Sequence, residues 1–200
     1  ADATLQTSSV LDNTGTVNVT GNATLNHATA DNDGTLTVGG AAHLSNSSHL
    51  DNDGSLTVTG AATVDASTVI NGAESASASI TAASAALTAL STLTNSGHVQ
   101  ITNAATADHS TITNSASSEI DAGSTALTTS TTLTNSGLVK VSGAATADAS
   151  TITNNVSSEI DAGSATLSNT STLTNAGLVK VAADATLQTS SVLDNTGTVN

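Results

Sequence analysis

The residues with the clearest chemical potential are five aspartates near the beginning of the chain. They occur in the segments DNTG, DNDG and DNDG, beside an asparagine, at Asp12, Asp31, Asp33, Asp51 and Asp53. Carboxylates that folding brings together repel one another unless they extend into water or a cation bridges them, and Ca²⁺ accepts such oxygen ligands without strict geometry. The spacing matches neither an EF-hand loop nor the glycine-rich nonapeptide calcium repeat. Two interpretations therefore stay open, a calcium-bridged face and a solvated acidic surface.

Threonines in a Thr-x-Thr pattern form a second candidate surface. The pattern recurs in five successive repeats, at Thr92 and Thr94, Thr111 and Thr113, Thr132 and Thr134, Thr151 and Thr153, and Thr172 and Thr174. Two such rows side by side resemble the ice-binding face of antifreeze β-solenoids, which makes ice binding one function that the pattern implies. Threonine is also the common outward residue of strands, and Asp12, Asp31, His49 and Asp51 interrupt the rows in the first repeats.

The composition excludes several functional classes. The chain contains no Cys, Met, Pro, Phe, Trp or Tyr, so it has no thiolate nucleophile, zinc finger, disulfide or aromatic stacking platform. A net charge of -14 disfavours binding to nucleic acid and to anionic membranes, and no run of about 20 apolar residues is present to span a bilayer. The histidines His27, His43, His49, His98 and His109 show no ligand spacing, and no catalytic spacing occurs. We therefore expect the chain to have no enzymatic activity and, unless calcium bridges the aspartates, to bind no cofactor.

Asparagine recurs along the whole chain at intervals of about 20 residues, and a period of this length indicates a solenoid. We expect the side-chain amides to stack into a ladder in which each donates to a carbonyl of the neighbouring turn, as in cross-β stacks. The alternative is a simple turn-forming role before glycine. Asn114 and Asn154 persist where Ala116 and Val156 replace that glycine, which favours the ladder. The ten asparagines are Asn13, Asn32, Asn52, Asn71, Asn95, Asn114, Asn135, Asn154, Asn175 and Asn195.

Apolar residues keep fixed positions relative to each asparagine. Around Asn13, Leu11 lies two residues before it, Val17 and Val19 lie four and six after it, and Leu25 lies twelve after it. Such alternation marks half-buried strands, and three apolar columns predict three short strands in each turn. We therefore expect an all-β parallel β-helix, right-handed, with about ten turns of about 20 residues. Gly or Asn recurs between the strands, and we expect these corners to require positive φ.

Both lysines of the chain stand five residues after a ladder asparagine, at a position expected to face solvent. Successive turns read Glu119, Lys140, Glu159 and Lys180 at this position. If they stack one turn apart, alternate signs replace like-charge repulsion with pairs worth about 0.2 to 1 kcal/mol each. We therefore predict a charge ladder that helps to fix the register of the stack.

A longer repeat overlies the turns. Residues 1–18 reappear without change at 183–200, nine turns further along the chain, whereas neighbouring turns differ considerably. We therefore predict that residues 1–200 form one continuous solenoid segment, in which 1–182 are one tandem unit and 183–200 begin the next copy. At strand spacing one unit is about 43 Å long. Its ends are expected to stack on further copies of itself, and lateral association of rods stays open.

The style of the repeat suggests a family. The segment LTNSGLVKVSGAATAD, with LxNxGxVxV recurring once in each turn and Thr, Ser, Asn, Ala and Gly dominating, resembles the β-helical stalks of large secreted bacterial adhesins. It is similar to the filamentous haemagglutinin type exported by two-partner secretion and to autotransporter passengers. The resemblance implies an extracellular fibre, secreted or held at the cell surface, that projects adhesive tips or builds a biofilm matrix. The family's secretion domain and receptor-binding regions have no counterpart here, so no adhesive target follows.

Overall fold

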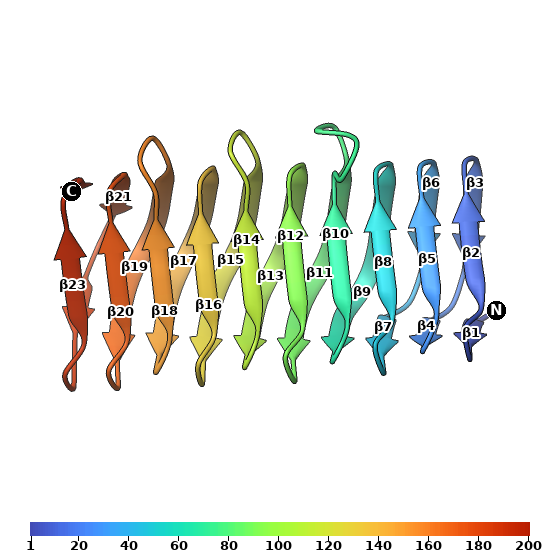
Figure 1. Ribbon diagram of the computed structural model, residues 1–200, viewed down its shortest axis with the longest axis horizontal. Coiled ribbons are helices and arrows are strands. Elements are labelled where there is room, and N and C mark those ends of the chain that lie inside the picture. The colour runs from blue at the N-terminus through green and yellow to red at the C-terminus, as the bar shows by residue number, and fades with distance from the viewer.

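The computed structural model describes residues 1–200, which form a rod of stacked parallel β-strands without any helix (Figure 1). Ten strands, one from each turn, pair in chain order in one sheet and end at the ten repeating asparagines. We call this the asparagine sheet. Its strands are β2 (Val10–Asn13), β5 (Thr29–Asn32), β8 (His49–Asn52), β10 (Thr68–Asn71), β12 (Thr92–Asn95), β14 (Thr111–Asn114), β16 (Thr132–Asn135), β18 (Thr151–Asn154), β20 (Thr172–Asn175) and β23 (Val192–Asn195).

The remaining 14 strands form a second sheet that closes the back of the rod. We call it the bent sheet, because each turn crosses it in two segments that meet at a bend. Its strands are β1 (Ala3–Gln6), β3 (Thr16–Val19), β4 (Ala23–Asn26), β6 (Thr35–Val38), β7 (Ala42–Ser45), β9 (Ser55–Asp65), β11 (Ser79–Thr88), β13 (His98–Asp108), β15 (Glu119–Thr128), β17 (Leu138–Asp148), β19 (Glu159–Ser168), β21 (Leu178–Val181), β22 (Ala185–Leu187) and β24 (Thr198–Val199).

The predicted parallel β-helix with three strands in each turn of about 20 residues is confirmed. From β9 to β19 the second and third strands run together, and the register shifts at the bend, for example between Ala82 and Ser84 where β11 pairs with β9. In Figure 1 the chain rises along the asparagine sheet in front, returns behind it and advances to the left. This path is a right-handed coil, the hand expected for parallel crossovers.

The corner glycines serve a different purpose from the one expected. Only one glycine, Gly72, has a positive φ, and the other left-handed residues are non-glycine residues such as His27 and Ala149, most of them at the corner before the asparagine sheet. The expectation of positive φ at the corner glycines is therefore wrong. All of them except Gly15 lie where successive turns approach closely: a Cβ on Gly34, for example, would lie against the carbonyl oxygen of Gly15 in the preceding turn.

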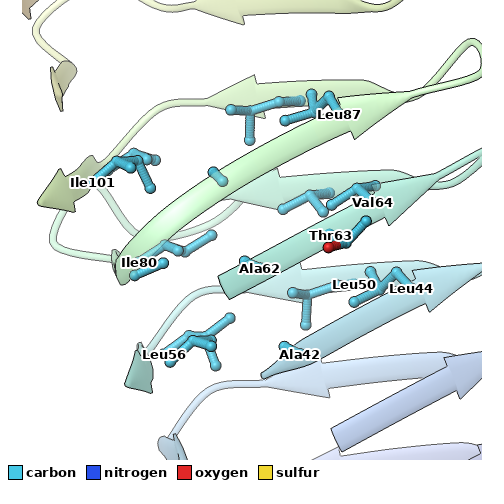
Figure 2. A pocket seen from close by; sticks show the side chains of 16 residues that line it. Ala42, Leu44, Leu50, Leu56, Ala62, Thr63, Val64, Ile80, Leu87 and Ile101 are labelled. Carbon is cyan, nitrogen blue, oxygen red and sulfur yellow. The ribbon is translucent and has the colours of Figure 1, made fainter. Parts of the chain in front are cut away.

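The core is a narrow column of aliphatic side chains between the two sheets, as Figure 2 shows for Leu50, Leu56 and Ile101. In its later part, large and small residues alternate with a period of two turns. Ala82 pairs with Ile101 in the next turn, whereas Leu87 pairs with Ala107. Each turn thus places a large side chain where the neighbouring turn has alanine, which fills a narrow interior without aromatic rings.

Candidate functional site in the ladders and outward columns

The structure brings all ten repeating asparagines into one row, which is buried except at Asn195. Each Nδ2 donates to the Oδ1 of the asparagine in the next turn, and the nine bonds measure 2.6 to 2.9 Å. The eight inner side chains, from Asn32 to Asn175, are completely buried. These bonds link every turn to the next. A buried amide that lost its hydrogen-bond partners would cost about 1–3 kcal/mol.

Nine of the ten asparagines, all but Asn195, also connect the two sheets. In the turn of Asn135, Nδ2 donates a second bond of 2.9 Å to the backbone carbonyl of Glu159, at the start of β19. Its Oδ1 accepts the N–H of Gly137 at 3.1 Å, so the asparagine is both a ladder residue and a turn residue. The two interpretations of the sequence therefore describe one side chain.

Two longer corners replace the glycine with a serine that makes the equivalent contact. The Ser118 hydroxyl donates to Asn114 Oδ1 at 2.8 Å, and the Ser158 hydroxyl donates to Asn154 Oδ1 at 2.7 Å. Both serines are buried. The carbonyl of each ladder amide thus keeps a donor, which explains physically why Asn114 and Asn154 persist without the following glycine.

A second polar row, which the sequence interpretation missed, lies four residues before each asparagine and is buried from Ser48 to Ser171. Backbone N–H groups donate to hydroxyls of the next turn, as Ser48 N does to Ser67 Oγ at 3.1 Å and Ser150 N does to Ser171 Oγ at 3.2 Å. The sequence signal is a column of hydroxyl residues broken only by Ala28. Its members are Ser9, Ser48, Ser67, Ser91, Ser110, Thr131, Ser150, Ser171 and Ser191.

Three of the five predicted acidic residues stack directly on the outer face of the asparagine sheet. Asp12 pairs with Asp31, and Asp31 pairs with Asp51. Burial raises the pKa of Asp31 and of Asp51 above the usual 3.8, and neighbouring carboxylates, with Asp33 foremost for Asp31 and Asp53 for Asp51, raise it further. One oxygen of Asp51 is buried without a hydrogen-bond partner. The column is therefore a site of repulsion between carboxylates, which His49 offsets only in part.

The aspartates do not form a recognisable metal site. Asp53 turns its Oδ1 toward the backbone N–H groups of Glu74 and Ser75, at 2.8 and 3.1 Å. Nowhere does the structure bring together three His, Asp or Glu side chains in a set that could hold a metal ion. The five histidines are also dispersed: His98 lies 3.5 Å from Glu119, and His109 lies 3.4 Å from Asp108.

Replacing Asp51 with asparagine should stabilise the chain in a pH-dependent way. The pKa of Asp51 is higher in the folded chain than its usual value of 3.8. The stability that comes from protonating this side chain is therefore fully present below pH 3.8 and is lost as the pH rises through the folded-state pKa. The Asp51→Asn variant stays neutral at every pH. Its Tm at pH 7 should exceed that of the wild type by about 1–4 °C, and the difference should shrink toward pH 3 in thermal melts followed by circular dichroism.

The matched control for this substitution is Asp161→Asn. Asp161 lies between Lys140 and Lys180, so the same loss of charge removes attraction there and should not raise the Tm. An Asp51→Asn variant that melts at or below the wild-type temperature at pH 7 would contradict the interpretation of the column as repulsive.

The predicted charge ladder of Glu119, Lys140, Glu159 and Lys180 needs a correction of register. Lys140 pairs with Asp121 on one side and Asp161 on the other, whereas Glu119 and Glu159 pair with Leu138 and Leu178 in the adjacent column. The corners after Asn114 and Asn154 hold two more residues than those after Asn95 and Asn135. In those two turns, a strand position found by counting from the asparagine is therefore wrong by two residues.

Charges nevertheless alternate along the corrected column. Asp121, Lys140, Asp161 and Lys180 succeed one another turn by turn. Lys180 also reaches diagonally to Glu159, with 2.7 Å between Nζ and Oε1, and this hydrogen bond raises the pKa of Lys180. The lysines thus lie beside carboxylates on two adjacent columns, which lets the pairing favour one register of the stack.

The threonines of the Thr-x-Thr pattern lie in two straight rows on the outer face of the asparagine sheet. Thr111 pairs with Thr132 and Thr113 with Thr134, and the same register holds from β12 to β20. The rows continue at β10 as Thr68 and Ile70 and then meet the acidic column at Asp51. The asparagine sheet thus carries an uncharged outer surface over β10 to β20 beside an acidic one over β2 to β8.

Chemically, these features support stacking and surface contact: two buried hydrogen-bonding rows, one alternating charge column and two outer surfaces of different charge. The structure contains no helix, and therefore none that could span a membrane. Comparison of the chain with protein-family models, curated proteins and solved structures found no match.

Proposed function

We propose that this chain is a structural segment of a secreted bacterial fibre or large adhesin, in which it acts as a stalk and carries no active site. The observation that carries the proposal is the asparagine row, which passes through all ten turns without a break. Because each turn is bonded to the next in the interior as well as along both sheets, a pull along the axis loads many hydrogen bonds. Such a rod is mechanically suited to act as a stalk that holds an adhesive element at a distance from the cell surface.

The pairing of the last turn supports the proposal of a tandem array. Residues 183–200, which repeat 1–18, stack on the preceding turn in regular register: β22 pairs with β19, β23 with β20 and β24 with β21. Asn175 donates to Asn195 at 2.7 Å. In the proposed fibre further copies of the nine-turn unit continue the same ladder, which makes copies of the chain its own axial partners.

Immunoelectron microscopy of native bacterial cells tests the proposal. Antibodies raised against the purified chain should label filaments outside the cell, and averaged images of these filaments should show an axial repeat of about 43 Å, which is nine turns at strand spacing. Cells lacking the gene provide the control for labelling. Labelling confined to the cell interior would overturn the extracellular assignment, and filaments without this repeat would overturn the tandem array.

The registered threonine rows support a second candidate, ice binding. Over five turns two hydroxyl residues per turn repeat at strand spacing on one uncharged surface, which offers a regular lattice of hydroxyl and methyl groups. This candidate requires thermal hysteresis from the purified chain, with a loss in Thr134→Lys at the middle of the rows and none in Thr146→Lys on the bent sheet. A chain that shows no thermal hysteresis excludes ice binding without affecting the proposal of a stalk.

A further inference from the structure

The core contains one cavity much larger than the others. It has a volume of about 150 Å³ and is lined by 14 residues, all apolar, from the first three turns. Four other core cavities measure between about 40 and 80 Å³, and Figure 2 shows the one of about 70 Å³ between Ala42 and Ile101. The interior of the rod is therefore filled less completely in its first turns than elsewhere.

Ala30, the smallest member of its column, lines this cavity. In the asparagine sheet it occupies the inward column whose other members are Leu, Ile or Val, and its direct neighbours are Leu11 and Leu50. Ala30 itself is buried, with 1% of its surface exposed. Shortening a buried leucine to alanine leaves a cavity wherever the surroundings cannot collapse.

The ladders prevent such a collapse. Asn32, two residues after Ala30, is bonded to Asn13 and to Asn52, both at 2.6 Å, and the strands on both sides pair in full register. The spacing of the turns is thus fixed by hydrogen bonds above and below. Val38, which is 1% exposed, and its neighbours on the bent sheet cannot move inward without breaking those bonds.

We propose that the cavity beside Ala30 is a binding site for one small apolar molecule of the size of xenon or benzene. A cavity of about 150 Å³ lined only by aliphatic groups stays dry and accepts such ligands, because water finds no hydrogen-bond partner there. The site takes uncharged molecules without hydrogen-bonding groups. Core cavities of 40 to 80 Å³ are too small for benzene, so benzene is confined to one site per nine-turn unit.

Methyl NMR spectra of the chain under xenon pressure test the site. The methyl signals of Leu11, Ala30 and Leu50 should shift with a single saturating binding curve, and those of Leu127 and Leu133, beside the smaller cavities, should shift much less. In Ala30→Leu, which fills the space, the shifts should disappear while the Tm equals or exceeds that of the wild type. Benzene should raise the Tm of the wild type and leave that of Ala30→Leu unchanged.

The wild-type measurement decides the proposal even if Ala30→Leu folds poorly. Wild-type methyl signals of Leu11, Ala30 and Leu50 that do not respond at saturating xenon would overturn it, and so would equal shifts along the whole core. Ala30→Val offers a smaller filling substitution, with a side chain that occurs in the same column at Val69. It should weaken xenon binding several-fold, and unchanged binding in a folded Ala30→Val chain would also contradict the site.

Discussion

Replacing Asn135 with leucine should lower the free energy of unfolding by about 3 kcal/mol, or the Tm by about 10 °C. The leucine has a similar size but makes none of the hydrogen bonds of the amide. Asn114 loses its acceptor, Asn154 loses its donor, and the N–H of Gly137 loses its partner at 3.1 Å. Each buried group left unpaired costs about 1–3 kcal/mol. Denaturant unfolding of the two chains measures the difference.

The matched control for this effect is Asn18→Leu. Asn18 lies on β3 between the inward residues Val17 and Val19, and its side chain is exposed. The same change in chemistry at this surface position should alter the unfolding free energy by less than about 0.5 kcal/mol. If Asn135→Leu had the same midpoint of denaturant unfolding as the wild type, the asparagine row would have no stabilising role.

Gly54→Ala should cost about 3 kcal/mol, because the added methyl group has no space between two turns. A Cβ on Gly54 would press against the carbonyl oxygen of Gly34 and lie 2.8 Å from that of Asp33. Both atoms belong to backbone that cannot retreat, since Asp53 and Gly54 donate their N–H groups to the carbonyl of Asn32 in the preceding turn, at 3.0 and 2.8 Å. Thermal melts should show a loss on the order of 10 °C.

Gly15→Ala tests the same substitution without the close approach. Gly15 follows Asn13 as Gly54 follows Asn52, but a Cβ at Gly15 meets no atom within 4 Å. Alanine there should be neutral or stabilise the chain by about 0.4–1 kcal/mol through the unfolded state. Equal losses in both variants would show that backbone conformation, and not the contact between turns, selects glycine at this corner.

The architecture could be predicted from the sequence because the same positions of the repeat point into the core in every turn. Val17 and Val19 alternate with exposed residues in the pattern of a strand, and the inward column from Leu11 to Leu193 returns once per turn. Stacking identical positions in a parallel sheet leaves few arrangements other than a solenoid. The alternation within a strand also survives the insertion of two residues. Ile120, six residues after Asn114, faces inward like Val19 six residues after Asn13, although its partner is Val99 and not Ile101.

The details that escaped prediction depend on distances between turns. A count from Asn114 placed Glu119 beside Lys140, but the longer corner brings Asp121 there instead. Nothing in the pattern indicates whether a glycine permits a positive φ or a close contact, and at Gly34 the contact is the reason. The hydroxyl row was visible as a column of serine and threonine, yet exposed corners use the same residues, and only burial distinguishes Ser91 from an ordinary turn residue.

The length of the rod as a function of the number of units tests the central claim most directly. A chain of ten turns should be about 48 Å long, and each added nine-turn unit should extend it by about 43 Å, because the strand spacing is about 4.8 Å. Small-angle X-ray scattering from proteins with one, two and three units measures the maximum dimension. A linear increase of about 43 Å per unit with a constant cross-section is the expected result. A smaller increase, or a cross-section that grows with the number of units, would contradict a continuous solenoid fibre.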